Sequence, residues 1–136
     1  MKVTTVLCVD DHDALGGRLA PSLRDAGYDV VGVQGSEAAL TELSRRRVDV
    51  ALIDMRLPAA DGLELCREIR RRGPTRVIAL SPPTAATDAV AFLDAGADDY
   101  VTTPVAAAVL AARIRALLRR VDDQQGGSPL TTSTGR

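Results

Sequence analysis

Five short apolar runs lie at regular intervals along the chain, and each has the composition of a strand that is buried on both faces. They contain many β-branched residues and few polar ones, as is typical of strands in a parallel sheet. The runs are TVLCV (5–9), YDVVGV (28–33), VALIDM (50–55), RVIALS (76–81) and DYVTT (99–103). The pattern therefore predicts a sheet built from these runs.

Between the runs, apolar residues recur every three or four positions, which is the spacing of a helix with one buried face. This spacing is found at 15–23, 39–43, 63–69, 90–93 and 110–121. Strand and helix thus alternate along the chain. Such alternation with short connections predicts an α/β domain: a doubly wound parallel sheet of five strands with helices on both faces.

The first helical segment contains a local conflict. Gly16, Gly17 and Pro21 lie inside it, and an interior proline removes one backbone hydrogen bond at a cost of about 3 kcal/mol. We therefore expect this helix to begin late or to kink.

The end of the chain differs in composition from the rest. After Val121 the sequence is DDQQGGSPLTTSTGR, which is polar, rich in Gly, Ser and Thr, and without periodicity. It predicts a folded domain over residues 1–121 and a flexible linker over 122–136. A linker in this place indicates that a second domain follows in the natural protein.

Charge and composition exclude some functions. Seventeen Lys and Arg against 18 Asp and Glu leave a net charge of -1, so there is no overall basic surface for nucleic acid. No apolar run approaches the roughly 20 residues of a membrane span, and no secretory leader is recognisable. We expect a cytoplasmic domain without membrane contact, with Cys8 and Cys66 as small core residues.

Acidic residues follow two of the predicted strands. Asp10 and Asp11 end the first strand and Asp54 ends the third, while Ser81 ends the fourth. A single Asp in such a place can simply cap a helix. Together, however, carboxylates at the carboxyl edge of a parallel sheet need a compensating charge, and Mg2+ is the expected ion. A carboxylate beside Mg2+ and a hydroxyl is suited to receive a phosphoryl group.

Four separate stretches resemble the receiver domain of two-component response regulators over residues 3 to about 121. They are VLCVDDHDA, VALIDMRLPAADGLEL, VIALS and GADDYVTTPV. The resemblance implies a flavodoxin-like (βα)5 fold with strand order 2-1-3-4-5. It also implies phosphorelay signalling, with Asp54 as the phospho-acceptor and a sensor histidine kinase as the donor.

The same resemblance implies roles for further residues. Mg2+ would be held by Asp11, Asp54 and the backbone carbonyl of Arg56, with Asp10 acting through water. Ser81 would be the switch hydroxyl, and Tyr100 the aromatic residue whose rotamer follows phosphorylation. Pro58 and Gly62 match the turn after the acceptor.

The chain departs from the family pattern at two positions. Thr103 stands where the family places a lysine whose ammonium meets the phosphoryl group, and a neutral hydroxyl cannot neutralise a dianion. Pro82 follows Ser81, where the family offers a backbone N–H that proline lacks. Arg56 and His12 are near enough in sequence to compensate, but we expect both to be solvated loop residues.

AGADDYV followed by LAARIRALLRR resembles the OmpR/PhoB type of receiver, which is attached to a winged-helix DNA-binding domain. In that subfamily the matching charges form ion pairs between two subunits of a homodimer, and DNA is contacted only through the attached domain. The alternative is that these charges are exposed without a partner, since Val109 replaces a usual acid. The charges are Asp98, Asp99, Arg113 and Arg120.

Two functions remain open on the sequence. In the first, Asp54 is phosphorylated and the domain is a conventional switch regulating transcription. In the second, the chain is an atypical receiver that acts by dimerisation or ligand binding without phosphorylation. A Mg2+-dependent phosphatase would need a carboxylate where Arg56 stands, so we expect no enzyme.

Overall fold

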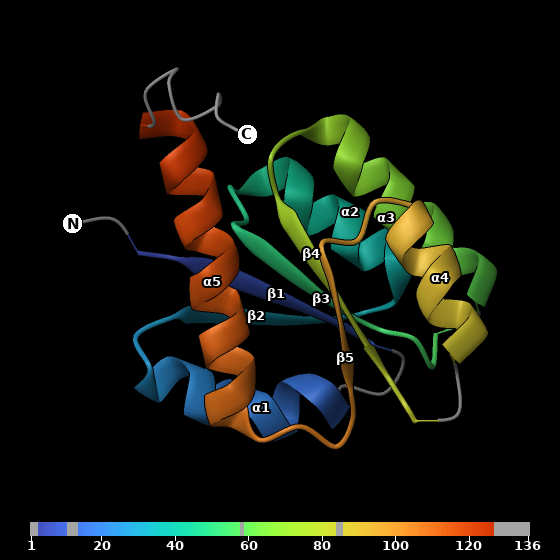
Figure 1. Cartoon of the computed structure of the whole chain (residues 1–136), viewed down its shortest axis with the longest axis horizontal. Coiled ribbons are helices and arrows are strands. Elements are labelled where there is room, and N and C mark those ends of the chain that lie inside the picture. Colours follow the sequence, from blue (N-terminus) through green and yellow to red (C-terminus); the bar gives the residue numbers. More distant parts are fainter. Residues whose placement is uncertain (1–2, 11–13, 58, 84–85, 127–136) are drawn as a thin grey trace, which may run out of the picture.

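The computed structural model describes residues 3–10, 14–57, 59–83 and 86–126 (Figure 1). Its strands alternate with its helices along the chain. The strands are β1 (Thr5–Asp10), β2 (Asp29–Gln34), β3 (Val50–Asp54), β4 (Arg76–Ser81) and β5 (Asp99–Thr102). The helices are α1 (Ala14–Asp25), α2 (Gly35–Arg45), α3 (Ala59–Arg72), α4 (Ala86–Asp94) and α5 (Ala107–Gly126).

The strands form one parallel sheet in the order β2-β1-β3-β4-β5, which confirms the predicted fold. The interior strand β1 pairs on both sides, so that Val6 lies between Val30 of β2 and Val50 of β3. Helices α1 and α5 cover one face of the sheet, and α2, α3 and α4 cover the other (Figure 1). Because all the strands are parallel, their carboxyl ends meet at one edge of the sheet.

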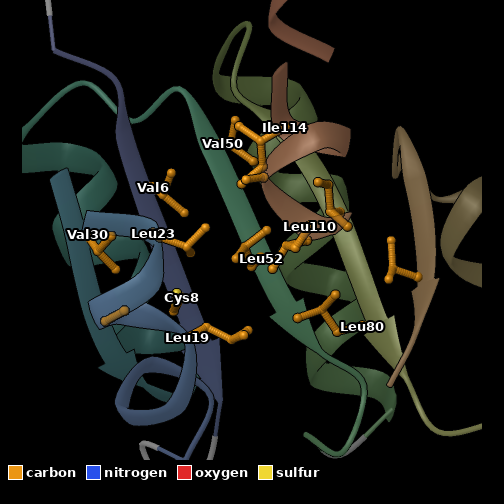
Figure 2. Close-up of a cluster of buried hydrophobic side chains, with 14 of the residues drawn as sticks. Val6, Cys8, Leu19, Leu23, Val30, Val50, Leu52, Leu80, Leu110 and Ile114 are labelled. Carbon is orange, nitrogen blue, oxygen red and sulfur yellow. The ribbon is translucent and has the colours of Figure 1, made fainter. Parts of the chain in front are cut away.

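Each face of the sheet has its own apolar core, because successive strand residues point to opposite sides. Val6 and Cys8 of β1 pack with α1 and α5, in the cluster drawn in Figure 2. Leu7 and Val9 pack with the helices of the other face. Cys66 lies in that second core, so both cysteines are buried, as predicted.

Helix α1 does not start late. It begins at Ala14 and includes Gly17 and Pro21. Its buried face, with Leu19 and Leu23, packs on the sheet. Tertiary packing of an apolar face outweighs local propensity in most helices, and it does so here.

Helix α5 extends past the predicted domain end at 121 and stops at Gly126. The segment after Val121 is polar, but it contains no glycine or proline before Gly126, so nothing in it breaks the helix. Residues 122–126 are therefore helical where we expected a linker, and the rest of that segment lies outside the described residues. Within the described residues, no helix has both the length and the apolar character needed to cross a bilayer.

Candidate functional site at the carboxyl edge of the sheet

Three buried polar residues end three neighbouring strands at this edge. They are Asp10 of β1, Asp54 of β3 and Ser81 of β4, with relative exposures of 2%, 5% and 0%. The register places them together, because Val9 pairs with Ile53 and Asp54 pairs with Leu80. Asp11, His12 and Pro58 lie outside the described residues.

Both carboxylate oxygens of Asp54 are bonded to Arg56. The Arg56 backbone N–H donates to Oδ1 at 2.9 Å and Nε donates to Oδ2 at 3.0 Å. Nε also donates to Oδ1 at 3.2 Å, and Nη2 donates to Oδ2 at 2.7 Å. The hydrogen bond to Asp54, the charge of that carboxylate and, more weakly, the charge of Asp10 raise the pKa of the Arg56 guanidinium.

This geometry corrects the expectation for Arg56. Its side chain is 60% exposed, as a loop residue would be, but its guanidinium is held by the predicted acceptor. The sequence carried one signal for this contact, a cation two positions after a strand-end carboxylate. That signal did not distinguish a side chain folded back onto Asp54 from one extended into water.

The predicted switch residues are in direct contact. The Tyr100 hydroxyl donates to Oγ of Ser81 at 2.8 Å, and that Oγ donates to the Pro82 carbonyl at 2.9 Å. The Thr103 backbone N–H donates to the Ser81 carbonyl at 2.7 Å, which ties the end of β5 to the end of β4. These contacts bring together the hydroxyl, the aromatic residue and both positions at which the sequence departs from the family pattern.

Thr103 borders a small hollow on the α1 side of this edge. The hollow has a volume of about 220 Å³ and is also lined by Arg18 and Leu19 of α1 and by Pro104. Arg18 is the one positively charged residue among the described residues that line the hollow.

On the α3 side, Gly62 leaves room for Phe92, because a Cβ atom at Gly62 would lie 2.8 Å from the ring carbon Cζ.

Asp99 and Arg113, two of the residues predicted to face a partner subunit, pair within the chain. Arg113 Nη1 lies 3.1 Å from Oδ2 of Asp99. Three apolar residues of α4 and α5 are exposed: Val90 at 60%, Leu93 at 45% and Val109 at 49%. The side chain of Arg120 is not among those described.

Asp98, the remaining predicted member of that face, is engaged elsewhere. Its Oδ2 accepts hydrogen bonds from Arg70 at 3.1 Å and from the Val77 backbone N–H at 2.9 Å. Its Oδ1 accepts a third from Arg76 at 3.3 Å. Asp98 thus joins α3, β4 and the start of β5 inside one molecule, a role that the sequence did not reveal.

The donor set at the edge suits a hard divalent cation. In the described part of the chain no three His, Cys, Asp or Glu residues form a metal-binding group. Asp10 and Asp54 nevertheless bring buried carboxylates to one place, and oxygen is the ligand atom that Mg2+ prefers. Because both oxygens of Asp54 already bond to Arg56, a metal ion there must displace part of this contact.

Comparisons with known proteins place these residues in context. The family model described as "Response regulator receiver domain" matches residues 6–115. Sensory transduction protein RegX3 of Mycobacterium tuberculosis is 41% identical over 121 residues, which are 89% of this chain and 53% of that protein. Transcriptional regulatory protein CseB of Streptomyces coelicolor is 43% identical over 124 residues, 91% of this chain and 53% of that protein. The chain thus spans about half the length of these relatives.

Solved structures agree with the sequence matches. The receiver domain of the TMAO respiratory system response regulator TorR has a TM-score of 0.80 at 30% identity, covering 86% of this chain and 98% of that one. The BeF3-activated DrrB receiver domain has a TM-score of 0.77 at 28% identity, covering 87% of this chain and 99% of that one. The similarity therefore extends over nearly all of each solved domain.

Proposed function

The chain belongs to the response regulator receiver domain family, and from that premise we propose that Asp54 accepts a phosphoryl group from a sensor histidine kinase. The observation that supports this most is the placement of Asp54. It is a nearly buried carboxylate at the carboxyl edge of the sheet, and its strand lies between β1, which ends in Asp10, and β4, which ends in Ser81. A helix cap, the alternative role, would bond to N–H groups of the following helix, whereas the described bonds of the Asp54 carboxylate go to Arg56, before α3 begins.

In the proposed step, an oxygen of Asp54 forms a bond to phosphorus while the bond from phosphorus to the imidazole nitrogen of the kinase breaks. The electron pair of that bond leaves with the nitrogen, and Asp54 becomes an acyl phosphate. The residues that would hold Mg2+ are Asp10, Asp11, Asp54 and the Arg56 carbonyl, and the ion would neutralise charge on the transferring group. Ser81 and the backbone around it position the group.

Asp54→Asn should abolish this modification. Incubation with Mg2+ and acetyl phosphate, followed by intact-mass measurement, should show one added phosphoryl group on the original protein and none on the variant. Asp61→Asn, which changes an exposed acid of α3, serves as the matched control and should be modified normally. Modification of Asp54→Asn at the original level would rule out Asp54 as the acceptor.

We extend the proposal to the output of the protein. The matched residues make up 53% of each relative, and one relative carries the name of a transcriptional regulatory protein. The receiver would accordingly occupy 1–121, with 122–136 leading to a winged-helix domain that contacts DNA. In this arrangement the receiver controls transcription without touching DNA itself.

A second function, dimerisation without phosphorylation, is favoured by the contact between Tyr100 and Ser81. The Tyr100 hydroxyl points inward and donates a hydrogen bond to the switch hydroxyl of Ser81. Val90 and Leu93 of α4 and Val109 of α5 are exposed as well, and we take them together with β5 as the face of the proposed dimer. We propose that this face forms a symmetric homodimer, in which Asp99 and Arg113 set the register.

Arg113→Ala should weaken that dimer about two- to fivefold, since an exposed ion pair contributes at most about 1 kcal/mol. Sedimentation equilibrium over a range of concentrations measures the dissociation constant. The control is Arg67→Ala, which removes an exposed arginine paired with Glu64 on α3 and should change nothing. A protein that stays monomeric at high concentration contradicts the proposal.

A further inference from the structure

We infer that Arg56 replaces the cation that the last strand lacks at Thr103: its guanidinium pairs with Asp54 until a metal ion and a phosphoryl group bind, and then pairs with the phosphoryl oxygens. This inference rests on the proposed role of Asp54 as acceptor. It assigns Arg56 two opposite effects. The first is that the side chain competes with the metal ion for Asp54, and the second is that it stabilises the bound phosphoryl group.

The starting position of Arg56 supports the first effect. Among the described residues, every side-chain hydrogen bond to Asp54 comes from Arg56. Nε and Nη2 together contact both carboxylate oxygens, a two-point contact that a guanidinium makes readily. A metal ion binding to Asp54 must therefore displace at least one of these bonds.

The exposure of the Arg56 side chain supports the second effect. The backbone N–H of Arg56 is anchored to Oδ1 of Asp54 at 2.9 Å, so the residue stays beside the acceptor. Its side chain is 60% exposed, whereas that of Asp54 is 7% exposed. The guanidinium can thus leave the carboxylate and still reach a group attached to it, without disturbing the core.

The charge of the site requires such a cation. The two buried carboxylates, Asp10 and Asp54, already balance the two charges of Mg2+, so a phosphoryl dianion would bring excess negative charge into the site. Thr103 supplies no charge there, but a guanidinium would balance the excess. The planar guanidinium of arginine can also donate to two phosphoryl oxygens at once, which the ammonium of lysine does less well.

Arg18 is the rival cation. It is exposed and lines the hollow beside Thr103, so an arginine from α1 could also point to the phosphoryl group. The two candidates differ in the contact they make without a ligand, because Arg56 holds Asp54 directly. Substituting each arginine separately distinguishes them.

The experiment measures two ligands on the same variants. Mg2+ affinity is followed by titration with amide NMR, and binding of beryllofluoride in the presence of Mg2+ is followed by fluorine NMR. Arg56→Gln should bind Mg2+ alone about two- to fivefold more tightly, because an exposed ion-pair competitor is gone. The same variant should bind beryllofluoride about ten- to a hundredfold more weakly, because a charge-assisted contact is lost.

Three further variants test the assignment. Thr103→Lys in the Arg56→Gln background should restore beryllofluoride binding, since it returns a cation from the other side of the site. Arg56→Lys should retain part of the affinity, because it keeps the charge but not the two-point contact. Arg18→Gln should leave both affinities unchanged.

The outcomes separate this inference from the proposed function. The role of Arg56 is wrong if the original protein and Arg56→Gln bind beryllofluoride equally well, or if Arg18→Gln alone loses binding. Either result would leave the proposal that Asp54 is the acceptor unchanged. If Mg2+ affinity falls in Arg56→Gln, the inference that Arg56 competes with Mg2+ for Asp54 is wrong. If beryllofluoride binds to none of the proteins, including Thr103→Lys, and acetyl phosphate modifies none of them, the proposed function fails and the phosphoryl role of Arg56 fails with it.

Discussion

Replacing Pro82 by alanine should raise the affinity of the domain for beryllofluoride about ten- to a hundredfold. Proline has no backbone N–H, so the position after Ser81 cannot donate to a phosphoryl oxygen. A hydrogen bond to a charged group contributes about 1.5 to 3 kcal/mol, which gives this range. The surrounding backbone is held in place by the bond from Thr103 N–H to the Ser81 carbonyl, so an alanine N–H would be presented at a fixed position.

The measurement is fluorine NMR of the bound species with Mg2+ present, comparing the original protein, Pro82→Ala, and Pro82→Ala combined with Thr103→Lys. Pro83→Ala is the matched control, because Pro83 is exposed and lies one residue farther from Ser81. The added lysine should contribute little while Arg56 is present and much more in Arg56→Gln, since effects at one shared ligand couple. An unchanged affinity in Pro82→Ala would show that this backbone position does not face the phosphoryl group.

The sheet could be predicted because its strands are buried on both faces. A strand that is covered on both faces needs no polar residues on either side, so a short, continuous apolar run such as VALIDM indicates a central strand. The carboxyl edge follows from parallel geometry, and it brought Asp10, Asp54 and Ser81 together as expected. The start of α1 was less predictable, because the cost of Pro21 is local while the packing of Leu23 is tertiary.

The contacts of long side chains could not be predicted from the sequence. Arg56 has several rotatable bonds, and its position two residues after Asp54 permits a folded-back or an extended side chain equally. The choice depends on how buried the carboxylate is and which other cations are near, and both are properties of the folded site. For the same reason, the sequence did not show that Asp98 joins two arginines that are 22 and 28 residues away.

Asp98→Ala should lower the free energy of unfolding by about 2 to 3 kcal/mol, because it leaves the Val77 N–H and two largely buried arginines without their shared acceptor. The side chains of Arg70 and Arg76 are 28% and 18% exposed, so water replaces the lost bonds only in part. The stem of Arg70 also passes over Gly96, whose φ of 117° favours glycine in the turn before β5. Loss of Asp98 would therefore loosen the junction of α3, β4 and β5.

Urea unfolding followed by circular dichroism measures this effect, and the neighbouring Asp99→Ala is the matched control. Asp99 accepts hydrogen bonds from the adjacent Tyr100 N–H and from Arg113, whose side chain is 48% exposed, so its removal should cost less, about 1 kcal/mol. The pair of variants also separates two roles for adjacent acids. Asp98 should matter for stability in the monomer, whereas Asp99 should matter for the proposed dimer. Equal losses of stability in the two variants would mean that the bonds of Asp98 are replaced by water after all, and that it is as available to a partner subunit as Asp99.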